Sequence, residues 1–215
     1  MPFLSPDIET FKNSLDGFVA VAQKQQTDSH AAIKIQSMLN VTVYVMATRF
    51  LEGSVKHVVY NCCKMKGFSD DKLSKLVSEL RRFNNPEYSK IQKLVKDKLN
   101  HDISDGLDSG EFKQSDVTFL NQIVQNRHRN VHASSDSTEW YNQNKKDLSN
   151  FLQEYPGLIS ILEYLARLEF KPGSKSITLG QTLSPSRAAI IAAVPVTHTD
   201  TSSLSLWSRF KRYFS

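Results

Sequence analysis

The sequence predicts an all-α fold, a helical domain followed by a flexible C-terminal tail. Over most of the first 170 positions, apolar residues recur at three- and four-residue spacing, the period of a helix that buries one face. The 215 residues include only eight Gly and seven Pro, which suits long helices better than a β fold with many turns. Hydrophobic residues make up 40% of the chain and charged residues 23%, so a packed core is possible.

A first helix is expected over residues 5–26, where a Ser-Pro pair supplies a cap and a first turn. A long second helix is expected over residues 28–66, and Gly67 ends it as a C-terminal cap. The β-branched run at 41–45 lies within this range and has the composition of a strand. Because no turn residues bound that run, we assign it to the helix.

A third helix is expected to begin at Ser69 or Asp70, and the Asn-Asn-Pro sequence at 84–86 ends it. A fourth helix follows, with its apolar positions between residues 91 and 99. Residues 101–115 are rich in Asp, Gly and Ser, and this composition predicts a loop.

A fifth helix is expected to begin at Ser115 or Asp116 and to lead directly into residues 127–132. After a second polar loop, a last helix is expected over residues 139–169. Pro156 lies within that range, and we expect it to kink or divide the helix because proline lacks the amide hydrogen that the helix needs.

The composition changes after residue 170, and we place a domain boundary there, between a helical domain at 1–170 and a tail at 171–215. Residues 171–203 are rich in Ser, Thr, Pro and Ala without a helical period, which is typical of a flexible linker. The final residues mix aromatic side chains with three cations. This amphipathic segment either docks on a membrane surface, an RNA or a partner protein, or packs on its own domain.

The net charge of the chain, +5, belongs to the tail. Residues 171–215 contain six Lys and Arg against one Asp, so the tail alone carries +5 and residues 1–170 are neutral overall. The basic character of the chain is therefore no sign that the helical domain binds nucleic acid.

The two cysteines, Cys62 and Cys63, are adjacent and cannot cross-link distant parts of the chain. We therefore expect a reducing, cytoplasmic location. No paired CxxC or HxxxH spacing indicates a metal site, so neither a metal nor another cofactor is expected. Charged residues near the N-terminus argue against a secretory signal, and no apolar run approaches the ~20 residues of a membrane span.

The segment 127–132, Arg-His-Arg-Asn-Val-His, carries the candidate chemistry. RNA contains its own nucleophile, the 2′-hydroxyl, so its cleavage needs a group that moves protons and a cation that stabilises the phosphorane. His132 suits the first task because imidazole titrates near neutrality. Arg127 suits the second because its charged fork matches phosphate oxygens. The alternative is a surface His and a helix-terminal Arg that interacts with the helix dipole.

Residues 119–134, FLNQIVQNRHRNVHAS, resemble the signature of the HEPN superfamily. This is an all-α fold whose motif is an Arg, a polar residue, and a His about four to six residues after the Arg. The earlier stretch at 47–59, ATRFLEGSVKHVV, with Arg49, Phe50 and Glu52 in the long second helix, resembles the "RFE" helix of the RiboL-PSP type of HEPN protein. The resemblance covers residues 1–170 and none of the tail.

The resemblance implies a HEPN-like antiparallel helical bundle in which Arg127 and His132 are the catalytic pair and His128 is the adjacent polar residue. Two subunits would bring their motifs together in one composite cleft, so a homodimer is expected. The implied activity is metal-independent endonucleolytic cleavage of RNA, as a toxin, an antiviral defence effector or an RNA-processing enzyme. An antitoxin or a defence-system protein is then an expected partner.

Two features depart from the commonest form of the motif. That form has Asn after the Arg, and a small residue before a His that Gly follows, whereas this chain has His128, Val131 and Ala133. A frame that begins at Arg129 would restore the Arg-Asn pair, but no His lies four to six residues beyond it. Some members of the fold do not cleave RNA. The alternative function is therefore a non-catalytic helical module that binds a protein or nucleotide partner.

Two further residues are candidates for a supporting role. Glu52 either orients His132, holds Arg127, lies on the helix surface, or pairs with Arg49 within its own helix. Asn130 either helps to position a phosphate or simply ends the helix, and the same alternatives apply to Asn126.

Overall fold

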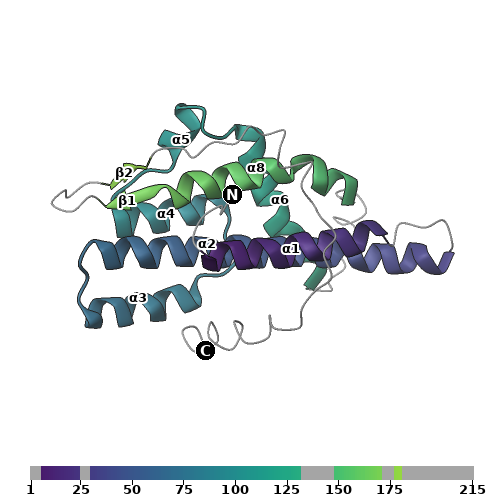
Figure 1. Ribbon diagram of the computed structural model, residues 1–215, viewed down its shortest axis with the longest axis horizontal. Helices are drawn as coiled ribbons and strands as arrows, with labels where there is room; N and C mark the ends of the chain where they lie inside the picture. Colours follow the sequence, from purple (N-terminus) through teal and green to yellow (C-terminus); the bar gives the residue numbers. More distant parts are fainter. Residues whose placement is uncertain (1–5, 25–29, 132–147, 171–176, 181–215) are drawn as a thin grey trace.

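The computed structural model describes residues 6–24, 30–131, 148–170 and 177–180, and this part of the chain is almost entirely helical (Figure 1). The prediction of an all-α fold is therefore confirmed. Short strands form one two-stranded hairpin. The elements are α1 (Pro6–Lys24), α2 (His30–Met65), α3 (Asp70–Arg82), α4 (Tyr88–Leu99), α5 (Ser104–Asp108), α6 (Gln114–Val131), α8 (Leu148–Ala166), β1 (Leu168–Phe170) and β2 (Ile177–Leu179).

The long helix α2 organises the fold, and α1 lies along it in the antiparallel direction (Figure 1). The Phe11 ring of α1 lies so close to Gly53 of α2 that an added Cβ would be 3.1 Å from it. One turn further along α2, His57 Nδ1 is 3.6 Å from Asp7 Oδ2. Residue numbers therefore increase along α2 in the direction in which they decrease along α1, so the two helices are antiparallel. The β-branched run at 41–45 is part of α2, as predicted.

Gly67 ends α2 as the sequence predicted. Its φ of +82° lies in the left-handed region that glycine adopts without strain. The amide of Phe68 donates to the carbonyl of Cys63 at 3.2 Å, and the amide of Gly67 donates to that of Lys64 at 3.0 Å. These bonds satisfy carbonyls that the end of a helix would otherwise leave without a donor.

An aromatic cluster joins three helices in the core. The fully buried ring of Phe151 in α8 lies edge-on to Tyr44 of α2 and to Phe119 of α6, with centroid distances of 5.5 and 5.8 Å. It also stacks on Tyr155 of its own helix at 5.2 Å. The Tyr155 hydroxyl in turn donates to Asp16 Oδ1 of α1 at 2.9 Å. The burial of these large rings makes the packing of α1, α2, α6 and α8 a single cooperative core.

The last helix differs in part from the prediction, which was that Pro156 kinks or divides a helix over residues 139–169. Pro156 lies inside α8 and does not divide it, because apolar side chains on both sides of the proline are buried in the same core. The helix also ends at Ala166 and not at residue 169. Leu168–Phe170 is a strand, which pairs antiparallel with Ile177–Leu179. The described chain therefore continues in ordered pairing beyond residue 170, where the sequence had predicted that the tail begins.

The loop predicted at 101–115 contains the short helix α5, which the sequence did not indicate. The carboxylate of Asp102 accepts hydrogen bonds from the amide and the hydroxyl of Ser104, at 3.1 and 2.8 Å, and so starts this turn. Gly106 of α5 is buried against Phe112 and Tyr164. The polar side chains that predicted a loop thus form local hydrogen bonds within a compact turn.

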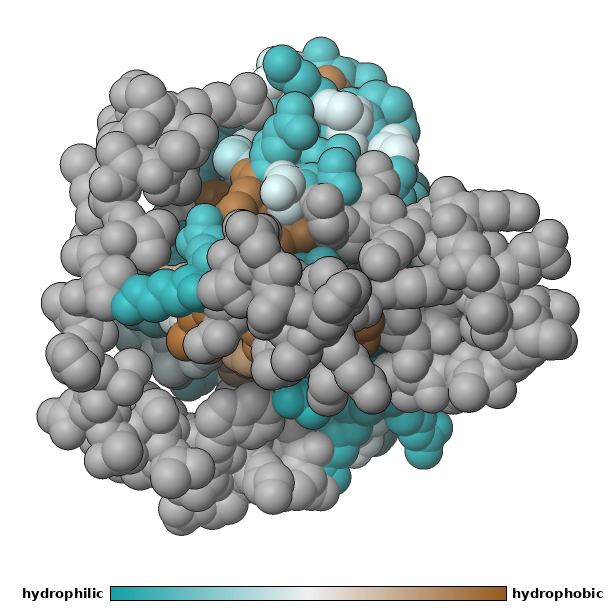
Figure 2. Space-filling model, turned by 90° about the vertical axis from the view of Figure 1, so that its right-hand side faces the viewer, coloured by the Kyte–Doolittle hydropathy of each residue, from teal (hydrophilic) through white to brown (hydrophobic). Residues whose placement is uncertain are grey.

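The surface of the described residues follows the usual partition of side chains. Where Figure 2 shows described residues, hydrophilic side chains lie mainly at the top and the bottom of the view, and hydrophobic patches are seen between them. Among the helices that the structure describes, none combines the length and the hydrophobicity that a membrane span requires.

Candidate functional site

Arg127 lies near the C-terminal end of α6, where this helix meets α2 and the turn between α3 and α4. Its Nη1 donates a hydrogen bond to Asn85 Oδ1 at 3.2 Å and lies 3.8 Å from Glu52 Oε2. The side chain is 29% exposed, so Arg127 is anchored in the fold and its side chain is still partly accessible to solvent. Two segments that are distant in the sequence therefore hold the candidate cation.

Glu52 links two cations. Its Oε2 faces Arg127, while its Oε1 accepts a hydrogen bond from Lys56 Nζ at 2.7 Å, one turn along α2. Only 9% of the Lys56 side chain and 22% of the Glu52 side chain are exposed. A carboxylate that is partly removed from water and lies between two cations is more than a plain surface residue. Of the arrangements that the sequence left open for Glu52, contact with Arg127 is present in the structure.

One turn before Arg127, α6 is tied to α2 through Thr48. Its hydroxyl is completely buried and lies 2.9 Å from the carbonyl oxygen of Tyr44 and 3.4 Å from that of Ile123. Because residues 48 and 123 precede Glu52 and Arg127 by four positions each, the same helix faces continue into the site. The packing of α6 on α2 thus determines the position along α2 at which Arg127 contacts Glu52.

Asn85 is a site residue that the sequence did not indicate. It lies in the Asn-Asn-Pro turn that the sequence predicted only as a helix break, and its φ is +48°. Asparagine tolerates this left-handed conformation better than most residues. The only signal in the sequence is an Asn at a turn, which is common in proteins and names no partner.

The structure describes the other predicted site residues only in part. The backbone of His128 and Asn130 belongs to α6, but their side chains lie outside the described part of the structure. His132 lies outside the described residues altogether. The pairing of Arg127 with His132 therefore stays a prediction. Asn126 is buried, and its side-chain amide donates to the Gln122 carbonyl at 2.8 Å within α6.

The two cysteines are not candidate nucleophiles. Both are buried free thiols, and the Sγ of Cys62 donates to the carbonyl of Leu168 at 3.2 Å. Burial raises the pKa of Cys62 to about 12, and burial also raises that of Cys63. A thiol that stays protonated at neutral pH is a poor nucleophile.

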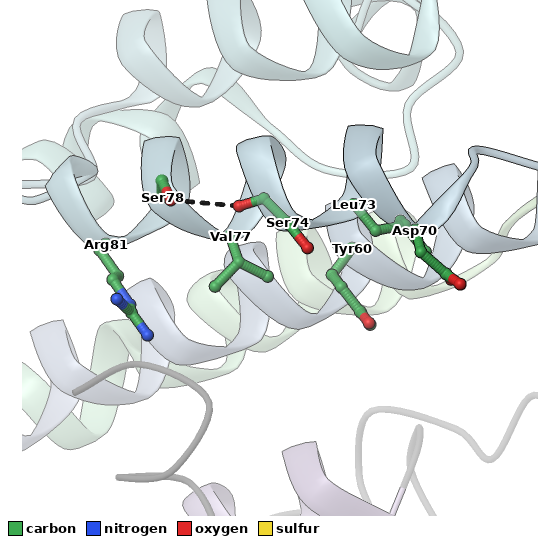
Figure 3. Close-up of a pocket in the computed structure, with 7 residues that line it drawn as sticks. All are labelled: Tyr60, Asp70, Leu73, Ser74, Val77, Ser78 and Arg81. Carbon is green, nitrogen blue, oxygen red and sulfur yellow. Dashed lines mark hydrogen bonds between the residues drawn. The ribbon is translucent and has the colours of Figure 1, made fainter.

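An open depression of about 440 Å³ lies elsewhere, between α2 and α3 (Figure 3). Tyr60 reaches it from α2, and the remaining lining side chains come from α3, with Asp70 and Arg81 towards its two ends. None of Arg127, Glu52 and Asn85 lines it. The depression is therefore separate from the candidate site.

A second polar cluster lies where α4 and α5 meet α8. His101 Nε2 and the Tyr164 hydroxyl are 2.8 Å apart, and the Tyr164 ring packs edge-on against Phe112. Burial lowers the pKa of His101, although the nearby carboxylates of Asp105 and Asp102 oppose this shift. Burial likewise raises the pKa of Tyr164 to about 12. At neutral pH this cluster therefore contains a neutral imidazole and a neutral phenol.

Acidification is expected to destabilise the fold through two histidines. Burial lowers the pKa of His57, as it does that of His101, below the ordinary value of a histidine. The unfolded chain then binds more protons just below about pH 6.5, the ordinary pKa of histidine, so the free energy of unfolding falls as the pH drops through this region. Urea unfolding at about pH 7.5 and about pH 5.5 measures the fall.

The variant His101→Gln should reduce this fall, since it removes one of the two titrations. Asp102 does not contribute in this pH range, because hydrogen bonds from Gln92 and Ser104 hold its pKa well below its usual value. Its stabilising effect is lost only in stronger acid. A free energy of unfolding that rose on acidification from about pH 7.5 to about pH 5.5 would contradict the assignment.

Among the described residues, no group of three or more His, Cys, Asp and Glu side chains is arranged to hold a metal ion. No family model matches the chain. No curated protein and no solved structure is significantly similar to it.

Proposed function

We propose that the chain is a metal-independent endoribonuclease of HEPN type. The observation that carries this proposal is the anchoring of Arg127, whose guanidinium is held by Glu52 and Asn85 and remains accessible at the end of α6. An arginine that is fixed in this way is preorganised to stabilise charge on a phosphate, and it needs no rearrangement when that charge develops.

In the proposed reaction, the 2′-hydroxyl oxygen of the RNA attacks the adjacent phosphorus. The new 2′-O–P bond forms as the bond from phosphorus to the 5′-oxygen breaks, which leaves a 2′,3′-cyclic phosphate and a free 5′-hydroxyl. His132 moves the proton in this step, because imidazole both accepts and donates protons near neutral pH. Arg127 stabilises the extra negative charge on the phosphorane.

The proposal includes the assembly and the role that the resemblance implies. Two copies of the chain form a composite site from their two 127–132 segments, with His128 and Asn130 beside the catalytic pair. The enzyme acts in the cytoplasm as a toxin or an antiviral defence effector, and its partners are RNA and an antitoxin or another protein of the defence system.

Purified protein is expected to cleave single-stranded RNA in excess EDTA and to yield 2′,3′-cyclic phosphate ends. His132→Ala should abolish cleavage while the circular dichroism and the unfolding midpoint stay unchanged. Cleavage that EDTA abolishes would contradict the proposed mechanism. Protein that binds RNA or a partner but never cleaves RNA would favour the alternative, a non-catalytic helical module.

A further inference from the structure

Asn85 has a left-handed backbone conformation. It has a φ of +48° in the turn between α3 and α4, and its carbonyl accepts a hydrogen bond from the Glu87 amide at 2.8 Å. The left-handed region costs a residue with a side chain free energy that glycine does not lose. Backbone positions of this kind occur often at functional sites, so the contacts of the Asn85 side chain decide whether it has a role.

The side chain of Asn85 has a specific partner. Its Oδ1 accepts the hydrogen bond from Arg127 Nη1 across 42 positions of sequence. Glu52 approaches the same nitrogen, at 3.8 Å. Within the described part of the chain, both contacts of the guanidinium are therefore made by Nη1. The opposite edge, formed by Nη2 and Nε, is the one that can meet a phosphate with two parallel hydrogen bonds.

The chemistry of the two acceptors differs, and the difference matters for an anion site. Glu52 carries a negative charge, which it shares with Lys56. Asn85 is neutral, so it fixes the orientation of the guanidinium without cancelling its charge. A second carboxylate in the place of Asn85 would hold Arg127 as firmly but would compete with the phosphate for it.

We infer that Asn85 is a positioning residue, which holds Nη1 of Arg127 through a neutral acceptor and so turns the Nη2 and Nε edge towards an RNA phosphate. This inference rests on the proposed function of the same site. It adds the turn between α3 and α4 to the site as the element that orients the catalytic cation.

Asn85→Gly tests the inference, because glycine adopts the same backbone conformation freely and removes only the acceptor. The kcat for RNA cleavage should fall about tenfold, the scale of one lost hydrogen bond to a charged group. The Kd for an uncleavable 2′-deoxy analogue should change by less than about twofold, because Arg127 acts mainly on the charge that develops during reaction. Asn85→Asp should instead weaken binding of the analogue.

Asn100 offers a matched control. It has a φ of +55° at the C-terminal cap of α4, so Asn100→Gly relieves the same kind of strain at a distance from the site. This variant should cleave RNA like the wild type. If Asn85→Gly and Asn100→Gly are equally active, Asn85 has no positioning role and the inference is overturned.

A second readout separates this inference from the proposed function. Nitrogen-15 NMR of the arginine side chains reports the rotation of each guanidinium, and that of Arg127 should become faster in Asn85→Gly. Wild-type protein that fails to cleave RNA refutes the nuclease proposal. Faster rotation of the Arg127 guanidinium in Asn85→Gly would then still show that Asn85 restrains this side chain. Active wild-type protein with unchanged Arg127 rotation in Asn85→Gly refutes the inference alone.

Discussion

Replacing Arg127 with alanine is expected to lower kcat for RNA cleavage by about 10²- to 10³-fold, the usual loss for one preorganised donor to a transition state. The guanidinium is held at Nη1 by Asn85 and Glu52, so its charge is already in place when the phosphorane forms. A single-turnover assay in EDTA with the enzyme in excess measures this step without product release.

Two comparisons make the Arg127→Ala result specific. Arg127→Lys keeps the charge but not the planar fork, so it should recover only part of the activity. Arg82→Ala removes an exposed arginine from the end of α3 and should leave activity unchanged. Thermal unfolding of Arg127→Ala should change little, because Glu52 retains its partner Lys56. Cleavage that survives the loss of both Arg127 and His132 would refute the site assignment.

The helices were predictable because their signals are local. The spacing of apolar residues predicted α1, α2, α3, α4 and α6 in order, since a helix that covers a core must repeat its apolar face every three to four residues. Gly67 marked the end of α2 for an equally local reason, the left-handed conformation at a helix cap.

The hairpin and α5 were not predictable in the same way. Each strand has three residues, which is too short for an alternating pattern to stand out. The strands exist because Leu168–Phe170 and Ile177–Leu179 supply each other with hydrogen-bond partners. The turn of α5 likewise depends on Tyr164, a residue far away in the sequence, for its packing.

The site shows the same division between local and distant signals. The sequence indicated Arg127 and Glu52 from their own neighbourhoods, and their contact follows from the way α6 packs on α2. Asn85 could not be found from its neighbourhood, because an Asn beside a Pro predicts a turn and nothing more. Only the fold brings that turn to the end of α6.

The stability of the α5 region is expected to respond sharply to a single methyl group. Gly106 is buried, and a Cβ at this position would lie 2.6 Å from Phe112 Cε1 and 2.7 Å from Tyr164 Cε2. Both rings are buried and pack against each other with a centroid distance of 5.5 Å, so neither can withdraw freely. Gly106→Ala should therefore lower the free energy of unfolding by about 1–3 kcal/mol, the usual cost of overpacking a core.

Gly17 in α1 provides the opposite case with the same substitution. No heavy atom lies within 4 Å of the Cβ that Gly17→Ala would add, and the residue is exposed. Alanine in a helix restricts the unfolded chain, so this variant should raise the free energy of unfolding by about 0.5–1 kcal/mol. Urea unfolding of both variants measures these two changes in the free energy of unfolding. Since Gly106 also lies in a helix, a stabilised Gly106→Ala would mean that helix propensity outweighs the contacts of Phe112 and Tyr164, and the packing described for α5 and α8 would be wrong.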